Sequence, residues 1–119
     1  MQFSEIPGLV EVKNTLIHSV KNNHVAHAQL FAGVEGSAAL PMAMAYATYV
    51  NCLEKTDTDS CGKCSSCSKF NKLIHPDLHI IFPVATNKKI TKDPSSDVFM
   101  PDWREAFLAN PFFTFNDWM

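Results

Sequence analysis

Four cysteines close together constrain this chain more than any other feature of its sequence. They follow the pattern Cys-x8-Cys-x2-Cys-x2-Cys, and the chain has no other cysteine; the four are Cys52, Cys61, Cys64 and Cys67. Gaps of two residues let neighbouring thiolates converge on one ion, and four thiolates complete the tetrahedron that structural zinc prefers. The spacing therefore predicts one structural zinc ion, held in a module that covers residues 52–67.

Two other interpretations of the cysteines stay open at this point. Disulfides are one of them, but the start of the chain lacks a signal peptide, and cysteines of cytosolic proteins are normally reduced. An iron–sulfur cluster also takes four thiolates, although the spacing does not match the common ferredoxin runs. A closed zinc tetrahedron leaves no position for a substrate, so no catalytic residue is expected in this module.

Composition indicates a folded domain without a membrane span. The chain has 119 residues, of which 46% are hydrophobic and 18% are charged, and this balance is typical of a globular protein. The formal net charge of -2 gives no overall attraction to nucleic acid or to an anionic membrane. The longest apolar stretch, residues 38–50, is too short for a bilayer. We expect a cytoplasmic protein with no membrane partner.

Hydrophobic periodicity predicts helices that alternate with short strands. Helices are expected over 9–22 and 39–53, with a short one over 67–74. Apolar runs over 28–32 and 78–82 indicate two buried strands. The polar stretch 83–101 is expected to be a loop. Asp102, with Glu105 three residues further on, predicts a capped helix that runs through Leu108.

The end of the sequence is unusually aromatic, with Phe112, Phe113, Phe115 and Trp118 in its last eight residues. Chain termini are usually polar and loosely ordered, so either these side chains pack onto the core or the chain is a fragment of a longer protein. Two strands are also too few for a stable sheet. Both observations favour a fragment.

The segment between the first expected strand and the following helix stands where a phosphate-binding loop would stand. When Gly33 is aligned with the first glycine of G-x-x-x-x-G-K-[ST], Ala39 occupies the lysine position and Leu40 the Ser/Thr position. The loop thus lacks the charge that meets the phosphates and the hydroxyl that binds Mg²⁺. No ATP binding is expected at this degenerate loop, which comprises Gly33, Val34, Glu35, Gly36, Ser37, Ala38, Ala39 and Leu40.

Several segments, taken in order, resemble one family. They are His-Ala-Gln-Leu-Phe-Ala-Gly at 27–33, the degenerate loop, the Ala-rich helix, the cysteine module and His-Pro-Asp at 75–77. Over about residues 6–81 the chain resembles the N-terminal part of bacterial DNA polymerase III clamp-loader subunits, the gamma/tau and delta prime group of AAA+ proteins. The resemblance implies an α/β fold. Residues 1–119 would be the incomplete N-terminal part of a three-layer, P-loop NTPase-like AAA+ domain, with the zinc module inserted.

Within this family, gamma and tau subunits carry the lysine of the phosphate-binding loop. Ala39 at that position therefore points to the delta prime branch. The resemblance implies a non-catalytic subunit that supports ATP-dependent loading of the sliding clamp onto primed DNA during DNA replication. Its implied partners are the other clamp-loader subunits, gamma/tau and delta, and, through the complex, the clamp and DNA. The family's Walker B segment, Ser-Arg-Cys motif, lid and collar are not found here, in agreement with a fragment.

Two alternatives to this function stay open. One is an ATP-hydrolysing gamma/tau-like subunit with an unconventional loop. The other is a zinc-ribbon-like module that binds nucleic acid or protein by itself. For the second, the positive charges are Lys63, Lys69 and Lys72, which Glu54, Asp57 and Asp59 offset, and no aromatic residues interleave with the lysines.

Overall fold

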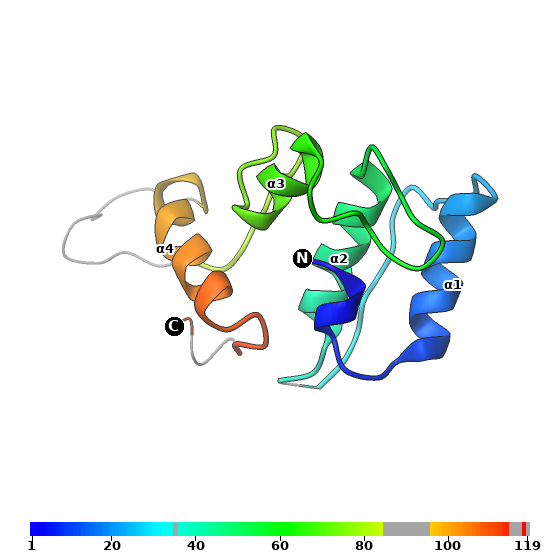
Figure 1. Ribbon diagram of the computed structural model, residues 1–119. Coiled ribbons are helices and arrows are strands. Elements are labelled where there is room, and N and C mark those ends of the chain that lie inside the picture. Colours follow the sequence, from blue (N-terminus) through cyan, green and yellow to red (C-terminus); the bar gives the residue numbers. More distant parts are fainter. Residues whose placement is uncertain (35, 85–95, 115–117, 119) are drawn as a thin grey trace.

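The computed structural model of the chain describes residues 1–34, 36–84, 96–114 and 118. Figure 1 shows α2 between α1 and α3, with α4 at the far end from α1. Among the described residues, none of the helices has the length and apolar character needed to cross a bilayer. The elements are a 3-10 helix η1 (Phe3–Glu5) and the α-helices α1 (Val10–Lys21), α2 (Ala39–Asn51), α3 (Ser65–Asn71) and α4 (Ser96–Ala109).

The first predicted helix is confirmed as α1. It begins after a turn in which Gly8 and Leu9 both have positive φ, 69° and 55°. Glycine adopts this left-handed conformation at no steric cost, which suits a sharp change of direction before a helix. Leu16 and Ile17 are buried and place the apolar face of α1 against α2.

Helix α2 is the centre of the fold. It contacts α1, α3 and η1 and buries residues around most of its circumference, including Met42, Tyr46 and Tyr49. Pro41 lies in the first turn, where its missing N–H would have had no helical partner in any case. The helix ends at Asn51, so that Cys52 directly follows it.

The predicted α/β architecture is wrong for the described residues, which form helices and no strand. The expected strands at 28–32 and 78–82 have no regular structure. Instead of pairing with a strand, both the N–H and the carbonyl oxygen of Phe82 hydrogen-bond with the hydroxyl of Ser96, at 3.1 Å each. These runs are not buried throughout either, since Leu30 and Ile81 are each 91% exposed. A strand also requires a neighbour with which to exchange hydrogen bonds. Without a sheet, these residues do not form the three-layer P-loop core.

The later helices differ from prediction at their boundaries. The short helix expected over 67–74 begins earlier, as α3 at Ser65, and α4 begins at Ser96, inside the expected loop 83–101. Of that loop, residues 85–95 lie outside the described ranges. Pro101 and Asp102 stand within α4, so the predicted cap at Asp102 is wrong. The helix extends further because Phe99, Trp103 and Phe107, spaced four residues apart, are all buried.

Aromatic stacking fixes α4 and the residues after it. The Trp103 ring stacks on Phe107 and on Phe82, with centroids 5.3 and 5.6 Å apart. Phe113 meets Trp103 edge-on at 5.8 Å, and Trp118 meets Phe82 in the same way at 5.1 Å. Phe113 and Trp118 therefore pack onto the core, which is the first of the two explanations for the aromatic end of the sequence. Phe115 lies outside the described residues.

Candidate metal centre

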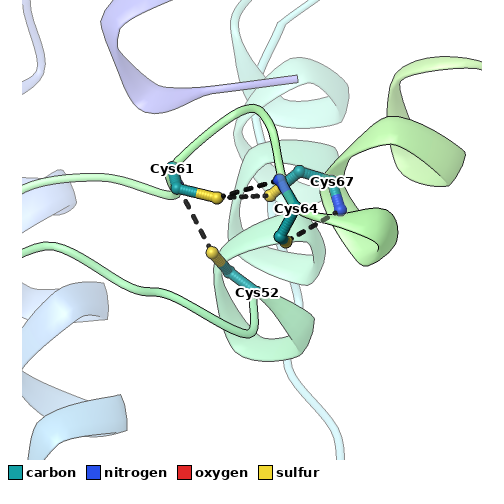
Figure 2. A group of neighbouring side chains, drawn as sticks. All are labelled: Cys52, Cys61, Cys64 and Cys67. Carbon is teal, nitrogen blue, oxygen red and sulfur yellow. Dashed lines mark hydrogen bonds between the residues drawn. The ribbon is translucent and has the colours of Figure 1, made fainter.

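The four cysteines gather at one point where α2, the following loop and α3 meet (Figure 2). All four sulfur atoms lie within 4.8 Å of one another, and the sulfurs of Cys61 and Cys67 are 3.9 Å apart. A tetrahedral ion with zinc–sulfur bonds of about 2.3 Å requires sulfurs about 3.8 Å apart. The predicted convergence is confirmed, and the four side chains could hold a metal ion such as zinc.

Backbone N–H groups are directed at the cysteine sulfurs. The N–H groups of Lys63 and Cys64 donate to Cys61 Sγ, at 3.5 and 3.2 Å. Cys67 N–H donates to Cys64 Sγ at 3.4 Å, and Cys61 N–H donates to Cys52 Sγ at 3.3 Å. Hydrogen bonds to the charged form of a group favour that form. The backbone therefore favours thiolates, the form that ligates metal.

The two-residue gaps close through the local conformation of the backbone. Gly62 has a φ of +76°, which permits the tight turn between Cys61 and Cys64. Cys64 is the N-cap of α3, and its sulfur accepts the hydrogen bond that caps the helix. Cys67 lies in the first turn of that helix and is fully buried. The start of α3 thus places two of the four sulfurs.

In the absence of a cation, the pKa values of Cys64 and Cys67 are shifted in opposite directions. Hydrogen bonds from the backbone N–H groups of Cys67 and Leu53 lower the pKa of Cys64 to about 6. Burial raises the pKa of Cys67 to about 12, because a buried thiolate loses its hydration. A divalent cation between the sulfurs would offset this penalty, since metal binding and thiol deprotonation are coupled.

The geometry does not support disulfides within this cluster. All four cysteines are free thiols. A disulfide bond requires sulfurs about 2.05 Å apart, well below the 3.9 Å between Cys61 and Cys67. An iron–sulfur cluster, the other alternative to zinc, also takes four thiolates, so this geometry is compatible with it. Elemental analysis for iron and zinc distinguishes the two.

One polar residue of the centre was missed by sequence reasoning, which treated Asp59 only as a charge that offsets lysines. The Asp59 carboxylate accepts hydrogen bonds from the backbone N–H groups of Phe3, Ser4 and Ser60. An aspartate that bonds the backbone beside it is a common turn device, and Asp-Ser directly before Cys61 was an available signal. No pattern in the neighbouring sequence could have predicted the contact of Asp59 with Phe3 and Ser4, because those residues lie more than fifty positions away.

The degenerate loop is a compact turn before α2. Ser37 N–H donates to the carbonyl oxygen of Val34 at 3.0 Å, and Gly36 has a φ of +77°. Gly33 approaches Ser37 so closely that a Cβ at Gly33 would lie 2.2 Å from Ser37 Oγ. Of the eight predicted residues, Glu35 lies outside the described ranges, Ala38 is the N-cap of α2, and Ala39 and Leu40 begin that helix. The helix after the loop is as predicted, and the strand before it is not.

A cavity of about 460 Å³ lies beside this loop, between α1 and α2. Leu16, Phe31 and Met42 are among its lining side chains, and no described residue that lines it is a lysine or an arginine. The polar side chains that reach it are Gln29 and Ser37. A triphosphate would find no opposing positive charge there, so the cavity favours apolar contacts over nucleotide.

Known proteins match the chain over much of its length. The sequence model of a family described as DNA polymerase III, delta subunit, matches residues 9–98. DNA polymerase III subunit delta' of Bacillus subtilis is 33% identical over 72 residues, which are 60% of this chain and 22% of that protein. DNA polymerase III subunit tau/gamma of Haemophilus influenzae is 29% identical over 65 residues, 55% of this chain and 9% of that protein.

The match extends to a plant protein. Protein STICHEL of Arabidopsis thaliana is 30% identical over 70 residues, which are 59% of this chain and 6% of that protein. The chain thus spans less than a quarter of the length of each of these relatives. No solved structure matches it significantly.

Proposed function

Since the chain belongs to the DNA polymerase III delta-subunit family, within the clamp-loader group of that polymerase, we propose that it acts as a non-catalytic subunit of delta prime type. In this proposal it supports ATP-dependent loading of the sliding clamp onto primed DNA in the cytoplasm. Its partners are the other clamp-loader subunits, with the clamp and the DNA reached through the complex. Both delta' and tau/gamma relatives match at similar identity, so their names do not decide between the two types.

The observation that favours delta prime is the chemistry of the degenerate loop. A working loop needs a lysine for the β- and γ-phosphates and a hydroxyl for Mg²⁺. This chain offers Ala39 and Leu40 at those positions, beside a cavity that no basic side chain lines among the residues that the structure describes. We therefore expect neither ATP binding nor ATP hydrolysis at this loop.

The four cysteines are proposed to hold one structural zinc ion within an insertion over residues 52–67. The ligands would be Cys52, Cys61, Cys64 and Cys67, whose sulfurs lie within 4.8 Å of one another. Zinc bound to four thiolates contributes on the order of 10 kcal/mol to folding, which a segment with few buried apolar side chains requires. The ion would stabilise the module and take no part in a reaction.

Nucleotide titration tests the delta prime proposal. Isothermal titration of the purified protein with ATP and Mg²⁺ is expected to give no binding at micromolar nucleotide. The matched variant Gly36→Ala alters the same turn without adding a phosphate ligand and should behave identically. Binding by the wild-type protein that is lost in Gly36→Ala, together with ATP hydrolysis, would instead identify a gamma/tau-like subunit.

Metal analysis tests the zinc assignment separately. Protein purified without chelator should contain one zinc per chain and no iron, as measured by elemental analysis. Iron with acid-labile sulfide would support the iron–sulfur alternative. A content well below one metal per chain would argue against the four-thiolate site altogether.

A further inference from the structure

The gap between the first two cysteines needs an explanation that the other gaps do not. A tight turn joins Cys61 to Cys64, and the first turn of α3 joins Cys64 to Cys67, whereas eight residues separate Cys52 from Cys61. Closing a flexible loop costs conformational entropy, and the cost grows with loop length. Yet Cys61 N–H reaches Cys52 Sγ at 3.3 Å. Some feature must hold the loop in this closed form.

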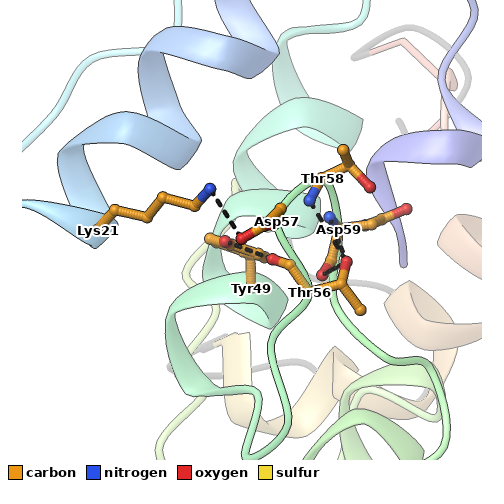
Figure 3. Close-up of polar contacts among 6 residues, drawn as sticks. All are labelled: Lys21, Tyr49, Thr56, Asp57, Thr58 and Asp59. Atoms are coloured by element: carbon orange, nitrogen blue, oxygen red, sulfur yellow. Dashed lines mark hydrogen bonds and ion pairs between the residues drawn. The ribbon is translucent and has the colours of Figure 1, made fainter.

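The first part of the answer lies within the loop, where residues 56–59 form a closed turn (Figure 3). Thr56 N–H and the Thr56 hydroxyl both donate to the carbonyl oxygen of Asp59, at 3.0 and 2.8 Å. The same hydroxyl oxygen accepts the N–H of Asp59 at 3.0 Å. These bonds fix the local shape of the loop but do not place it against the cysteines.

Contacts with the helices place the near side of the loop. Tyr49 of α2 donates its hydroxyl to the carbonyl oxygen of Thr56 at 2.9 Å. Lys55 Nζ donates to the carbonyl oxygen of Cys52 at 2.8 Å. Lys21 of α1 pairs with Asp57 at 3.1 Å, but the Asp57 side chain is 95% exposed, and ion pairs in such positions contribute little.

The N-terminal segment places the far side of the loop, next to Cys61. Asp59 Oδ1 accepts the N–H groups of Phe3 and Ser60 at 2.9 and 2.8 Å, and Oδ2 accepts that of Ser4 at 3.0 Å. Gln2 Nε2 donates to the carbonyl oxygen of Ser60 at 2.8 Å. One carboxylate thus joins two segments that are distant in sequence.

The N-terminal segment is itself fixed in the core, so it can serve as an anchor. The Phe3 side chain is 2% exposed, and its ring lies 5.7 Å from that of Tyr49. The Gln2 side chain also lies against Gly62, where an added Cβ would come within 2.9 Å of Gln2 Nε2. The residues on both sides of Cys61 are therefore in contact with Gln2.

We propose that Asp59 is a positioning residue of the metal centre, which holds Cys61 against Cys52 by tying the cysteine loop to residues 2–4. The N-terminal turn is then a structural part of the metal module, although it lies far outside residues 52–67. This inference rests on the zinc assignment proposed above. It requires that metal affinity depend on Asp59 and that docking of residues 2–4 depend on metal.

The chain offers a matched pair of variants for the first requirement. Asp59→Asn and Asp57→Asn each remove one negative charge from the same loop, two residues apart, but only Asp59 bonds the N-terminal segment. Competition with a chromogenic chelator should show zinc affinity lowered roughly tenfold or more in Asp59→Asn, the range found for groups that orient metal ligands. Asp57→Asn should stay within about twofold of wild type.

A graded series separates positioning from a general loss of charge. Asn keeps one oxygen that can accept the N–H of Phe3 or Ser60, whereas Ala keeps none. Zinc affinity should therefore fall from wild type to Asp59→Asn and again to Asp59→Ala. Equal affinity in Asp59→Asn and Asp57→Asn would overturn the proposal while leaving the zinc assignment intact.

Hydrogen exchange on the wild-type protein tests the second requirement without a variant that can misfold. Removing zinc with a chelator should speed exchange of the Phe3 and Ser4 amides at least about tenfold and leave those of Leu16 and Ile17 in α1 nearly unchanged. Unchanged exchange at Phe3 and Ser4 would overturn the proposal. Wild-type protein that binds no zinc at all would instead remove the zinc assignment and this inference together.

Discussion

The hydroxyl of Tyr49 donates a hydrogen bond to the carbonyl oxygen of Thr56 at 2.9 Å, joining the central helix α2 to the loop that precedes Cys61. The ring of Tyr49 is 1% exposed, so its body belongs to the hydrophobic core while its oxygen reaches a loop. Core packing and the arrangement of the cysteines are therefore linked through one side chain.

Replacing Tyr49 with phenylalanine should test that link. Tyr49→Phe keeps the packing of the ring but removes the bond to Thr56, which should lower the free energy of unfolding by about 1 kcal/mol. Urea denaturation followed by circular dichroism measures the change. Tyr46→Phe is a useful comparison, because Tyr46 bonds Ser19 and Gln29 and does not touch the cysteine loop. Only Tyr49→Phe should also weaken zinc binding.

The burial of Tyr49 also leads us to expect that the folded protein loses stability at high pH. Burial raises the pKa of Tyr49 above its ordinary value of 10.0, because the phenolate is disfavoured inside the protein. Its contribution to stability is thus fully present below pH 10 and is lost as the pH rises through the higher pKa of the folded state. Unfolding measured from pH 8.5 to 11 should show a steeper loss in wild type than in Tyr49→Phe. Equal slopes would contradict the assignment.

The cysteine cluster was predictable from the sequence because its signal is local. Two-residue gaps bring Cys61 close to Cys64, and Cys64 close to Cys67, whatever the remainder of the fold does. The contact between Asp59 and Phe3 was not predictable in this way, since it joins residues 56 positions apart in the chain. Local spacing therefore identified the cysteines, and only the structure identified the residue that ties the loop to the N-terminus.

The same difference between local and long-range signals explains why helix α2 was predicted correctly and the strands were not. Helix α2 satisfies its own backbone, so the apolar run from Ala39 predicted it well. The apolar run at 78–82 is only partly buried, because Leu78 and Phe82 pack against the core while Ile81 is 91% exposed. It did not predict a strand correctly, because pairing depends on a neighbour that the run itself does not specify. The polar stretch 83–101 likewise predicted a loop, yet α4 begins within it and includes Pro101, because burial of Phe99 and Trp103 outweighs the local cost of the proline.

Trp103 should carry much of the stability of the C-terminal part. It is 4% exposed and stacks on both Phe82 and Phe107. Trp103→Ala should cost about 3–5 kcal/mol, because it removes a large buried side chain and leaves a cavity. Leu108→Ala on the same helix is the control, with Leu108 54% exposed and an expected change within about 0.5 kcal/mol. Chemical denaturation of both variants distinguishes packing from a loss of helix propensity.

In the metal-free protein, the alkylation rates of Cys64 and Cys67 should follow the opposite shifts of their pKa values. The thiolate is the reactive form, and backbone hydrogen bonds lower the pKa of Cys64 to about 6. Alkylation at Cys64 should therefore rise between pH 5 and 7. Burial raises the pKa of Cys67, so its alkylation should stay slow at those pH values. Mass spectrometry of peptides after brief iodoacetamide treatment measures both rates, and faster labelling of Cys67 would contradict the order.

Cys64→Ser should separate the metal module from the rest of the fold. The change removes one of the four sulfurs but leaves a hydroxyl that can still cap α3, so zinc binding should be lost and the segment from Cys52 to Cys67 should loosen. Helices α1 and α2 should persist, because they pack on each other through Leu16, Ile17 and Met42. Elemental analysis, far-ultraviolet circular dichroism and hydrogen exchange in α1 measure these effects, with Ser65→Ala, at an exposed neighbouring position, as the control. Loss of most of the helical signal in Cys64→Ser, but not in Ser65→Ala, would show that the core depends on the metal more strongly than this packing implies.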